Sequence, residues 1–79
     1  MRSDKVTDVI MSLVVMPTHV SFMKDQIKYE LGIELSFNAV RCRCVRLVKK
    51  GLLEKYAPYT YVEKGWSEFY RQLEKEVGE

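Results

Sequence analysis

The spacing of the apolar residues changes along this chain, and the change limits its possible folds more strongly than any other feature. Three segments with apolar residues at helical spacing come first, then a run rich in tyrosine and β-branched residues, then a fourth helical segment. Apolar residues that recur every three or four positions predict amphipathic helices, whereas aromatic and β-branched runs favour strands. We therefore expect a mainly α, α+β fold in the order helix, short strand or connection, helix, helix, β-hairpin, helix.

Residues that start and stop helices set the expected boundaries. A serine precedes each of the first three helical segments, where its hydroxyl can accept a hydrogen bond from a free backbone amide. Proline disfavours helix in the residue before it, and glycine tolerates the positive φ common just after a helix. The serines are Ser3, Ser21 and Ser36, and the residues that end helices are Pro17, Gly32 and Gly51. The predicted helices span about residues 4–15, 22–31, 37–50 and 63–77, and the hairpin strands span 52–56 and 59–62.

The length of the chain fits one small domain over residues 1–79. A domain of this size buries only about 60% of the surface of its extended chain, so its core is marginal. The composition, with 47% hydrophobic and 30% charged residues, is that of an ordinary globular protein. No apolar run reaches the roughly 18 to 20 residues needed to cross a membrane, and no signal peptide is expected. With only Cys42 and Cys44 as cysteines, the protein is expected to be cytoplasmic, with reduced thiols.

The positive charge is concentrated in one segment, although the net charge of the chain is only +2. Residues 41–55 carry six basic side chains against Glu54 alone, whereas residues 63–79 carry five glutamates against three basic side chains. A charged helix face is most often a solvated one, but such faces usually mix both signs. Five basic residues without one acid between Arg41 and Lys50 are instead typical of a protein that binds a polyanion.

The sequence LGIELSFNAVRCRCVRLVKKGLLEK, residues 31–55, resembles the winged helix-turn-helix regulators of bacteria, archaea and archaeal viruses. The shared features are a Leu-Gly-Ile turn, a helix with apolar residues at 40, 44 and 47, and a Gly-Leu exit into a hairpin. The segment YTYVEKGWSEFYRQL, residues 59–73, resembles the second wing strand and the last helix of the same regulators. The turn before Val40 is longer here than in the simplest members.

This resemblance implies that the helix over 37–50 enters the major groove of double-stranded DNA, with the hairpin over 52–62 as the wing. Asn38 is then placed to read adenine, and Arg41 and Arg46 to read guanine or hold phosphate. The wing residues are expected to contact the minor groove or phosphates. The full set of expected DNA-binding residues is Asn38, Arg41, Cys42, Arg43, Arg46, Lys49, Lys50, Lys55 and Tyr59, with Arg43, Lys49 and Lys50 as backbone anchors.

The terminal helices carry more apolar residues than a small core can cover. In the last helix, Trp66 and Phe69 are expected to close the core, and the more distal residues to pair with a second copy. The expected homodimer interface consists of Tyr70, Leu73, Val77, Met11 and Val15. Such a dimer would present two basic helices to half-sites about one turn of DNA apart.

Catalytic and metal-binding chemistry finds little support in the sequence. His19 is the only histidine, so neither a zinc-type histidine pair nor a serine–histidine triad can form. Cys42 and Cys44 resemble the Cys-x-Cys pair of metal-sensing repressors, but residues two apart on a helix point away from each other. We expect Cys44 in the core and Cys42 as a surface thiol, and we expect no enzyme activity, metal, cofactor or small-molecule ligand.

The sequence leaves three functions open. The leading expectation is a dimeric transcription regulator, a repressor because no effector domain is evident. A winged-helix module that binds a protein partner within a larger assembly is the main alternative, although such a module needs no acid-free basic helix. A DNA-binding accessory protein of replication or of a virion is the third.

Overall fold

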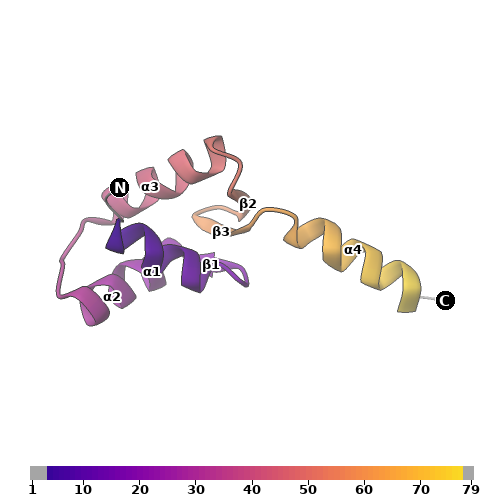
Figure 1. Ribbon diagram of the computed structural model, residues 1–79, viewed down its shortest axis with the longest axis horizontal. Coiled ribbons are helices and arrows are strands. Elements are labelled where there is room, and N and C mark those ends of the chain that lie inside the picture. The colour runs from indigo at the N-terminus through magenta and orange to yellow at the C-terminus, as the bar shows by residue number, and fades with distance from the viewer. Residues whose placement is uncertain (1–3, 78–79) are drawn as a thin grey trace.

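The computed structural model describes residues 4–77, and the side chains of residues 4–74. Helices α1, α2 and α3 pack together beside a small antiparallel sheet, and α4 extends away from them (Figure 1). The molecule is elongated because α4 extends in this way, and its dimensions are 47 × 27 × 19 Å. The elements are α1 (Lys5–Leu13), β1 (Thr18–His19), α2 (Val20–Leu31), α3 (Phe37–Lys49), β2 (Leu53–Ala57), β3 (Thr60–Glu63) and α4 (Trp66–Val77). The expected mainly α, α+β fold with a hairpin is therefore confirmed.

The sheet has the strand order β1-β3-β2, so the short strand between α1 and α2 pairs with the far strand of the hairpin. Thr18 lies opposite Tyr61, and Leu53 lies opposite Glu63. Two further backbone bonds connect β3 and the hairpin turn to the first two helices: the Glu63 amide donates to the Val14 carbonyl, and the Val20 amide to the Tyr59 carbonyl, both at 2.8 Å. The hairpin is thus bonded to the helical part of the chain at its turn and at the end of β3.

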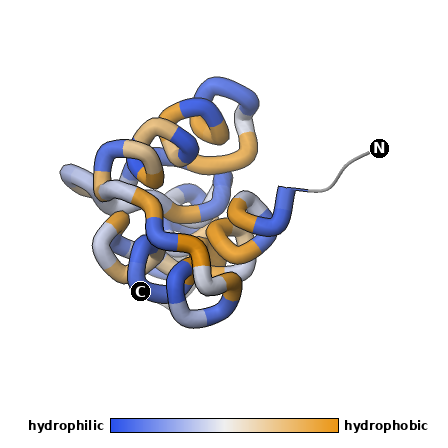
Figure 2. Tube along the Cα trace, turned by 90° about the vertical axis from the view of Figure 1, so that its left-hand side faces the viewer, coloured by the Kyte–Doolittle hydropathy of each residue, from blue (hydrophilic) through white to orange (hydrophobic). Residues whose placement is uncertain are grey.

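The core lies between the first three helices and the hairpin. Each of these three helices contributes apolar residues at the spacing expected from its sequence, and hydrophobic and hydrophilic residues alternate along the chain (Figure 2). The most deeply buried side chains are Ile10, Val14, Val20, Met23, Ile27, Val40, Cys44, Leu53 and Val62. The Cys44 thiol donates a hydrogen bond to the Met23 sulfur at 3.4 Å, within the contact between α2 and α3.

The N-caps of α1 and α2 differ from the sequence prediction. The N-cap of α1 is Asp4, whose carboxylate accepts hydrogen bonds from the amides of Val6 and Thr7; Ser3 lies outside the described residues. The N-cap of α2 is His19 rather than Ser21, because the imidazole Nδ1 accepts from the Ser21 amide at 3.1 Å. The prediction for α3 is confirmed, since the Ser36 hydroxyl accepts from the Ala39 amide.

The prediction that Trp66 and Phe69 close the core is wrong. Phe69 is 57% exposed and Trp66 is half-buried, and the described side chains of α4 contribute nothing to the core. The helix starts three residues later than expected, after Gly65, whose φ of 94° turns the chain away from α1–α3. Glu54 of β2 accepts hydrogen bonds from the amides of Gly65 and Ser67 at 3.0 and 3.4 Å, and so holds the start of α4 to the sheet.

Within residues 4–77, no helix has both the length and the apolar content of a membrane-spanning segment.

Candidate nucleic-acid interface

Helix α3 is fixed by its buried stripe and presents its other side to solvent. Val40, Cys44 and Leu47 point into the core, between 0% and 5% exposed. At 100° per residue, the opposite side of the helix carries Asn38, Cys42, Val45 and Lys49, with Arg41 and Arg46 beside them. Asn38, Arg46, Lys49 and Lys50 are exposed, whereas Arg41, Cys42, Arg43 and Val45 are partly covered. All of the predicted α3 residues therefore lie outside the buried stripe, and no acidic residue occurs within α3.

Asn38 and Arg41 form a pair at the start of this surface. They lie one helical turn apart, and the Arg41 Nε and Nη2 groups both donate to the Asn38 Oδ1, at 3.2 and 2.8 Å. From the sequence, Asn38 is expected to read adenine, and Arg41 to read guanine or hold phosphate, each by itself. In the structure, the Asn38 amide oxygen and one edge of the Arg41 guanidinium already contact each other.

Arg43 lies on a different side of α3 and faces α1. Its guanidinium forms a salt bridge with the Asp4 carboxylate and lies 3.4 Å from the Thr7 hydroxyl. The hydrogen bond from Arg43 and that from the Thr7 amide hold the pKa of Asp4 below its usual value of 3.8. Arg43 therefore joins α3 to α1, a role that its sequence position did not reveal, and its charge is partly neutralised at the surface predicted to contact phosphates.

The hairpin carries two of the predicted residues, and Tyr59 lies beside α3. Lys55 of β2 is exposed, and Tyr59 occupies the turn with 49% of its surface exposed. Tyr59 has a φ of 58°, a conformation that bulky residues rarely adopt. Its ring lies edge-on to Phe37 of α3 at 5.3 Å between centroids, and His19 lies 6.1 Å from Phe37 and 6.3 Å from Tyr59.

This aromatic cluster of His19, Phe37 and Tyr59 joins the starts of α2 and α3 to the hairpin turn. Sequence reasoning missed His19 and Phe37, since the three residues come from segments far apart in the chain and no spacing connects them. Burial raises the pKa of the neighbouring Tyr61 hydroxyl, with smaller effects from nearby Cys44 and Arg41. Tyr61 belongs to the core, with 4% of its surface exposed, and its hydroxyl stays uncharged at neutral pH.

The two cysteines differ in accessibility as expected. Cys44 is fully buried, and burial raises the pKa of its thiol to about 11, so it stays protonated at neutral pH. Cys42 is partly exposed on the outer side of α3. Residues 4–77 contain no group of three or more histidine, cysteine or acidic residues that could hold a metal ion.

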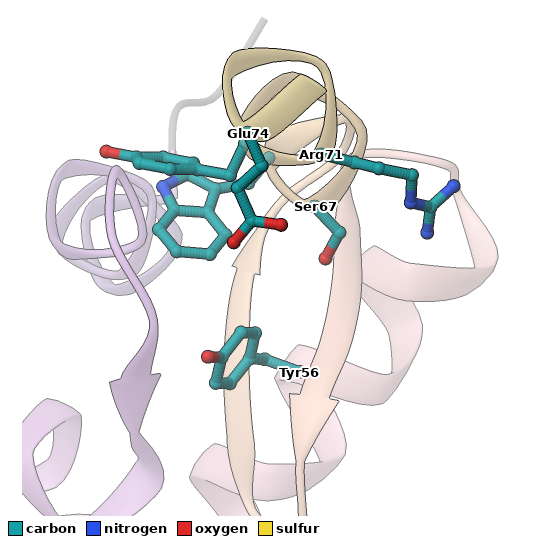
Figure 3. Close-up of a pocket in the computed structure, with 6 residues that line it drawn as sticks. Tyr56, Ser67, Arg71 and Glu74 are labelled. Atoms are coloured by element: carbon teal, nitrogen blue, oxygen red, sulfur yellow. The ribbon is translucent and has the colours of Figure 1, made fainter. Parts of the chain in front are cut away.

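A shallow pocket lies away from α3, between α4 and β2. Its volume is about 330 Å³ and it is lined by Tyr56, Trp66, Ser67, Tyr70, Arg71 and Glu74. In Figure 3, Ser67 and Glu74 of α4 face the side on which Tyr56 of β2 lies, and Arg71 points in another direction. The Trp66 ring packs edge-on against Tyr56 at 5.5 Å and lies 4.2 Å from the Tyr70 ring. The pocket thus results from the packing of α4 on the hairpin, which the sequence did not predict.

The predicted dimer residues fall into three groups. Tyr70, Leu73 and Val15 are 45%, 37% and 59% exposed, as an interface in the free protomer requires. Met11 packs against the core and is partly buried, so it offers less open surface than the other three, and its place in the interface stays a prediction. The side chain of Val77 lies outside the described residues. Phe69, which was expected in the core, joins the exposed group on α4.

Comparisons of the chain with protein-family models, with curated proteins and with solved structures find no match.

Proposed function

We propose that this protein is a winged helix-turn-helix transcription regulator that binds double-stranded DNA and acts as a repressor. The order of the elements supports the proposal. A short strand between α1 and α2 pairs with a hairpin that directly follows α3, and the three strands form one sheet. In this proposal α2 and α3 form the helix-turn-helix, and β2 and β3 form the wing.

The observation that carries the proposal is the outer surface of α3. The helix is anchored by buried residues on one side, and the other side presents basic residues with no acid among them. The major groove of B-DNA admits one α-helix, so this surface can approach base edges while its basic residues contact phosphates. Arg46, Lys49 and Lys50 are the proposed phosphate contacts of α3, and Asn38, Arg41 and Cys42 face the bases.

The hairpin extends this surface on the side of Arg41. Lys55 is positioned to meet a phosphate, and Tyr59 offers a hydroxyl and a ring at the tip of the wing. The packing of Tyr59 on Phe37 keeps the hairpin turn beside the start of α3. We therefore expect α3 and the hairpin turn to approach DNA together.

We also propose that two copies associate through α4. A 12-residue helix is only marginally stable in water without a packing partner, and α4 lies outside the core of its own protomer. Phe69, Tyr70 and Leu73 leave apolar surface open along it. A two-fold axis brings the same residues of both copies together, and it gives the dimer two α3 helices for a palindromic site.

The alternative of a protein-interaction module rests on the same exposed helix. In that case α4 binds a different protein, and α3 has no duplex to contact. Fluorescence anisotropy with a labelled random-sequence duplex of about 30 base pairs at low salt separates the two functions. The regulator binds at micromolar protein concentration or below, whereas a protein-interaction module leaves the anisotropy unchanged.

A further inference from the structure

The pair formed by Asn38 and Arg41 has a consequence for base recognition, given the proposed binding of duplex DNA. The two residues are three positions apart on α3, so their side chains are neighbours on the helix surface. The Ser36 cap fixes the first turn of α3, in which Asn38 lies. Both partners therefore start from a well-defined backbone, and their contact is local to α3.

The hydrogen bonds of the pair use up the acceptor capacity of Asn38. An amide oxygen has two lone pairs, and the Asn38 Oδ1 already accepts from two N–H groups of Arg41. Recognition of adenine by asparagine needs this same oxygen, because it must accept from the adenine N6 amino group while the side-chain amide donates to N7. Asn38 can read adenine only if it first releases Arg41.

Arg41 retains the edge of its guanidinium that recognises guanine. The group has five N–H donors in a planar fork. The Asn38 contact uses the side edge, formed by Nε and Nη2, and leaves the outer edge, formed by Nη1 and the second Nη2 hydrogen. This outer edge presents two parallel donors, which match the O6 and N7 acceptors of guanine.

We infer that Arg41 reads guanine and that Asn38 is its positioning residue, so that the two side chains specify one base pair. Without Asn38, the long arginine side chain samples many rotamers and must lose that freedom on binding. With Asn38, the outer edge of the guanidinium is already oriented. This assignment replaces the two base pairs that independent readers would specify.

Selection of bound sites from a random duplex pool tests the inference with five proteins: the wild type, Asn38→Ala, Arg41→Ala, the double variant Asn38→Ala/Arg41→Ala, and Asn38→Asp. We expect the wild type to prefer guanine at one position of each half-site, by about 5- to 150-fold. Both alanine variants lose preference at that same position, and the double variant loses no more than Arg41→Ala. Asn38→Asp keeps the guanine preference, since a carboxylate accepts the same two N–H groups.

Two other outcomes are distinguishable. If Asn38→Ala changes a second base pair, and the wild type prefers adenine there, the positioning role is overturned while DNA binding stands. If the wild type binds no duplex, the proposed function is overturned and the inference with it. Thermal melting of each variant, followed by circular dichroism, serves as the folding control; we expect no large change because Asn38 is exposed.

Discussion

The three arginines of α3 have different partners, and we infer a different role for each from its partner. Arg41 contacts a polar neighbour on its own helix, and Arg43 pairs with Asp4 of α1, 39 residues away in the chain. Arg46 forms no salt bridge with any described side chain. A cluster that looks uniform in the sequence therefore contains one oriented side chain, one that connects two helices, and one whose charge is open to an external anion.

The Asp4–Arg43 pair makes stability depend on pH in the acid range. The pKa of Asp4 is lower in the folded protein than its ordinary 3.8, so the charged carboxylate stabilises the fold above that value, and the contribution is lost as the pH falls through the lowered pKa. Replacement of Asp4 by Asn retains an N-cap and removes the charge. We expect Asp4→Asn to lower the free energy of unfolding at pH 7 by about 0.2 to 1 kcal/mol.

Urea unfolding at pH 7 and at successively lower pH measures this effect. The difference between the wild type and Asp4→Asn should shrink as the pH falls below 3.8. Asp25→Asn, at an exposed position on α2, is the matched control and should leave stability unchanged. A difference between wild type and Asp4→Asn that stays constant with pH would show that the charge of Asp4 does not stabilise the fold.

Among the elements, α4 lies outside the core and is joined to the hairpin by few contacts, of which the Glu54 cap is the polar one. Its first turn is attached to the sheet by Glu54, whose carboxylate accepts from two amides at the start of the helix. Hydrogen bonds from Ser67 and Gly65 hold the pKa of Glu54 below its usual 4.5, so the cap is charged at neutral pH. A charged carboxylate at a helix N-terminus also interacts favourably with the helix dipole.

Removal of this carboxylate should loosen α4 and leave the rest of the fold intact. For Glu54→Ala we expect faster hydrogen exchange of the backbone amides in residues 66–77, because the loss of an N-cap typically costs about 0.5 to 2 kcal/mol. Amides of α1–α3 should keep their protection. Glu63→Ala, an exposed acid on the neighbouring strand, is the control; equal exchange in α4 for both variants and the wild type would contradict the role of Glu54.

The elements also show how far local sequence determines the fold. The stripe of Val40, Cys44 and Leu47 and the Ser36 cap predicted α3 almost residue by residue, because periodicity and capping are local properties. The position of α4 could not be predicted, since it depends on a contact between residues 54 and 65. Neither the spacing of apolar residues nor a local capping pattern indicates that contact in the sequence. For the same reason the spacing of Asn38 and Arg41 is visible in the sequence, whereas the Asp4–Arg43 pair and the aromatic cluster are not.

At the scale of the whole molecule, the proposed dimer rests on the apolar side of α4. We expect Phe69→Glu combined with Leu73→Glu to shift the protein from dimer to monomer, because both side chains are exposed in the protomer and a charge cannot be buried without a partner. Tyr29→Glu on α2, where the ring is 84% exposed, is the control. Light scattering at micromolar concentration gives the mass; a monomeric wild type would contradict the dimer.

The salt dependence of duplex binding tests the central claim most directly. Neutralisation of about four phosphates per protomer, by Arg46, Lys49, Lys50 and Lys55, gives a slope of log affinity against log salt of about −3.6 for each protomer bound. Arg46→Ala should weaken binding to all sequences and make the slope less steep by about 0.9. Lys28→Ala, which removes an equal charge from α2 beside Glu34, should leave the slope unchanged. An affinity that does not vary between dilute and physiological salt would contradict DNA binding through the basic surface of α3.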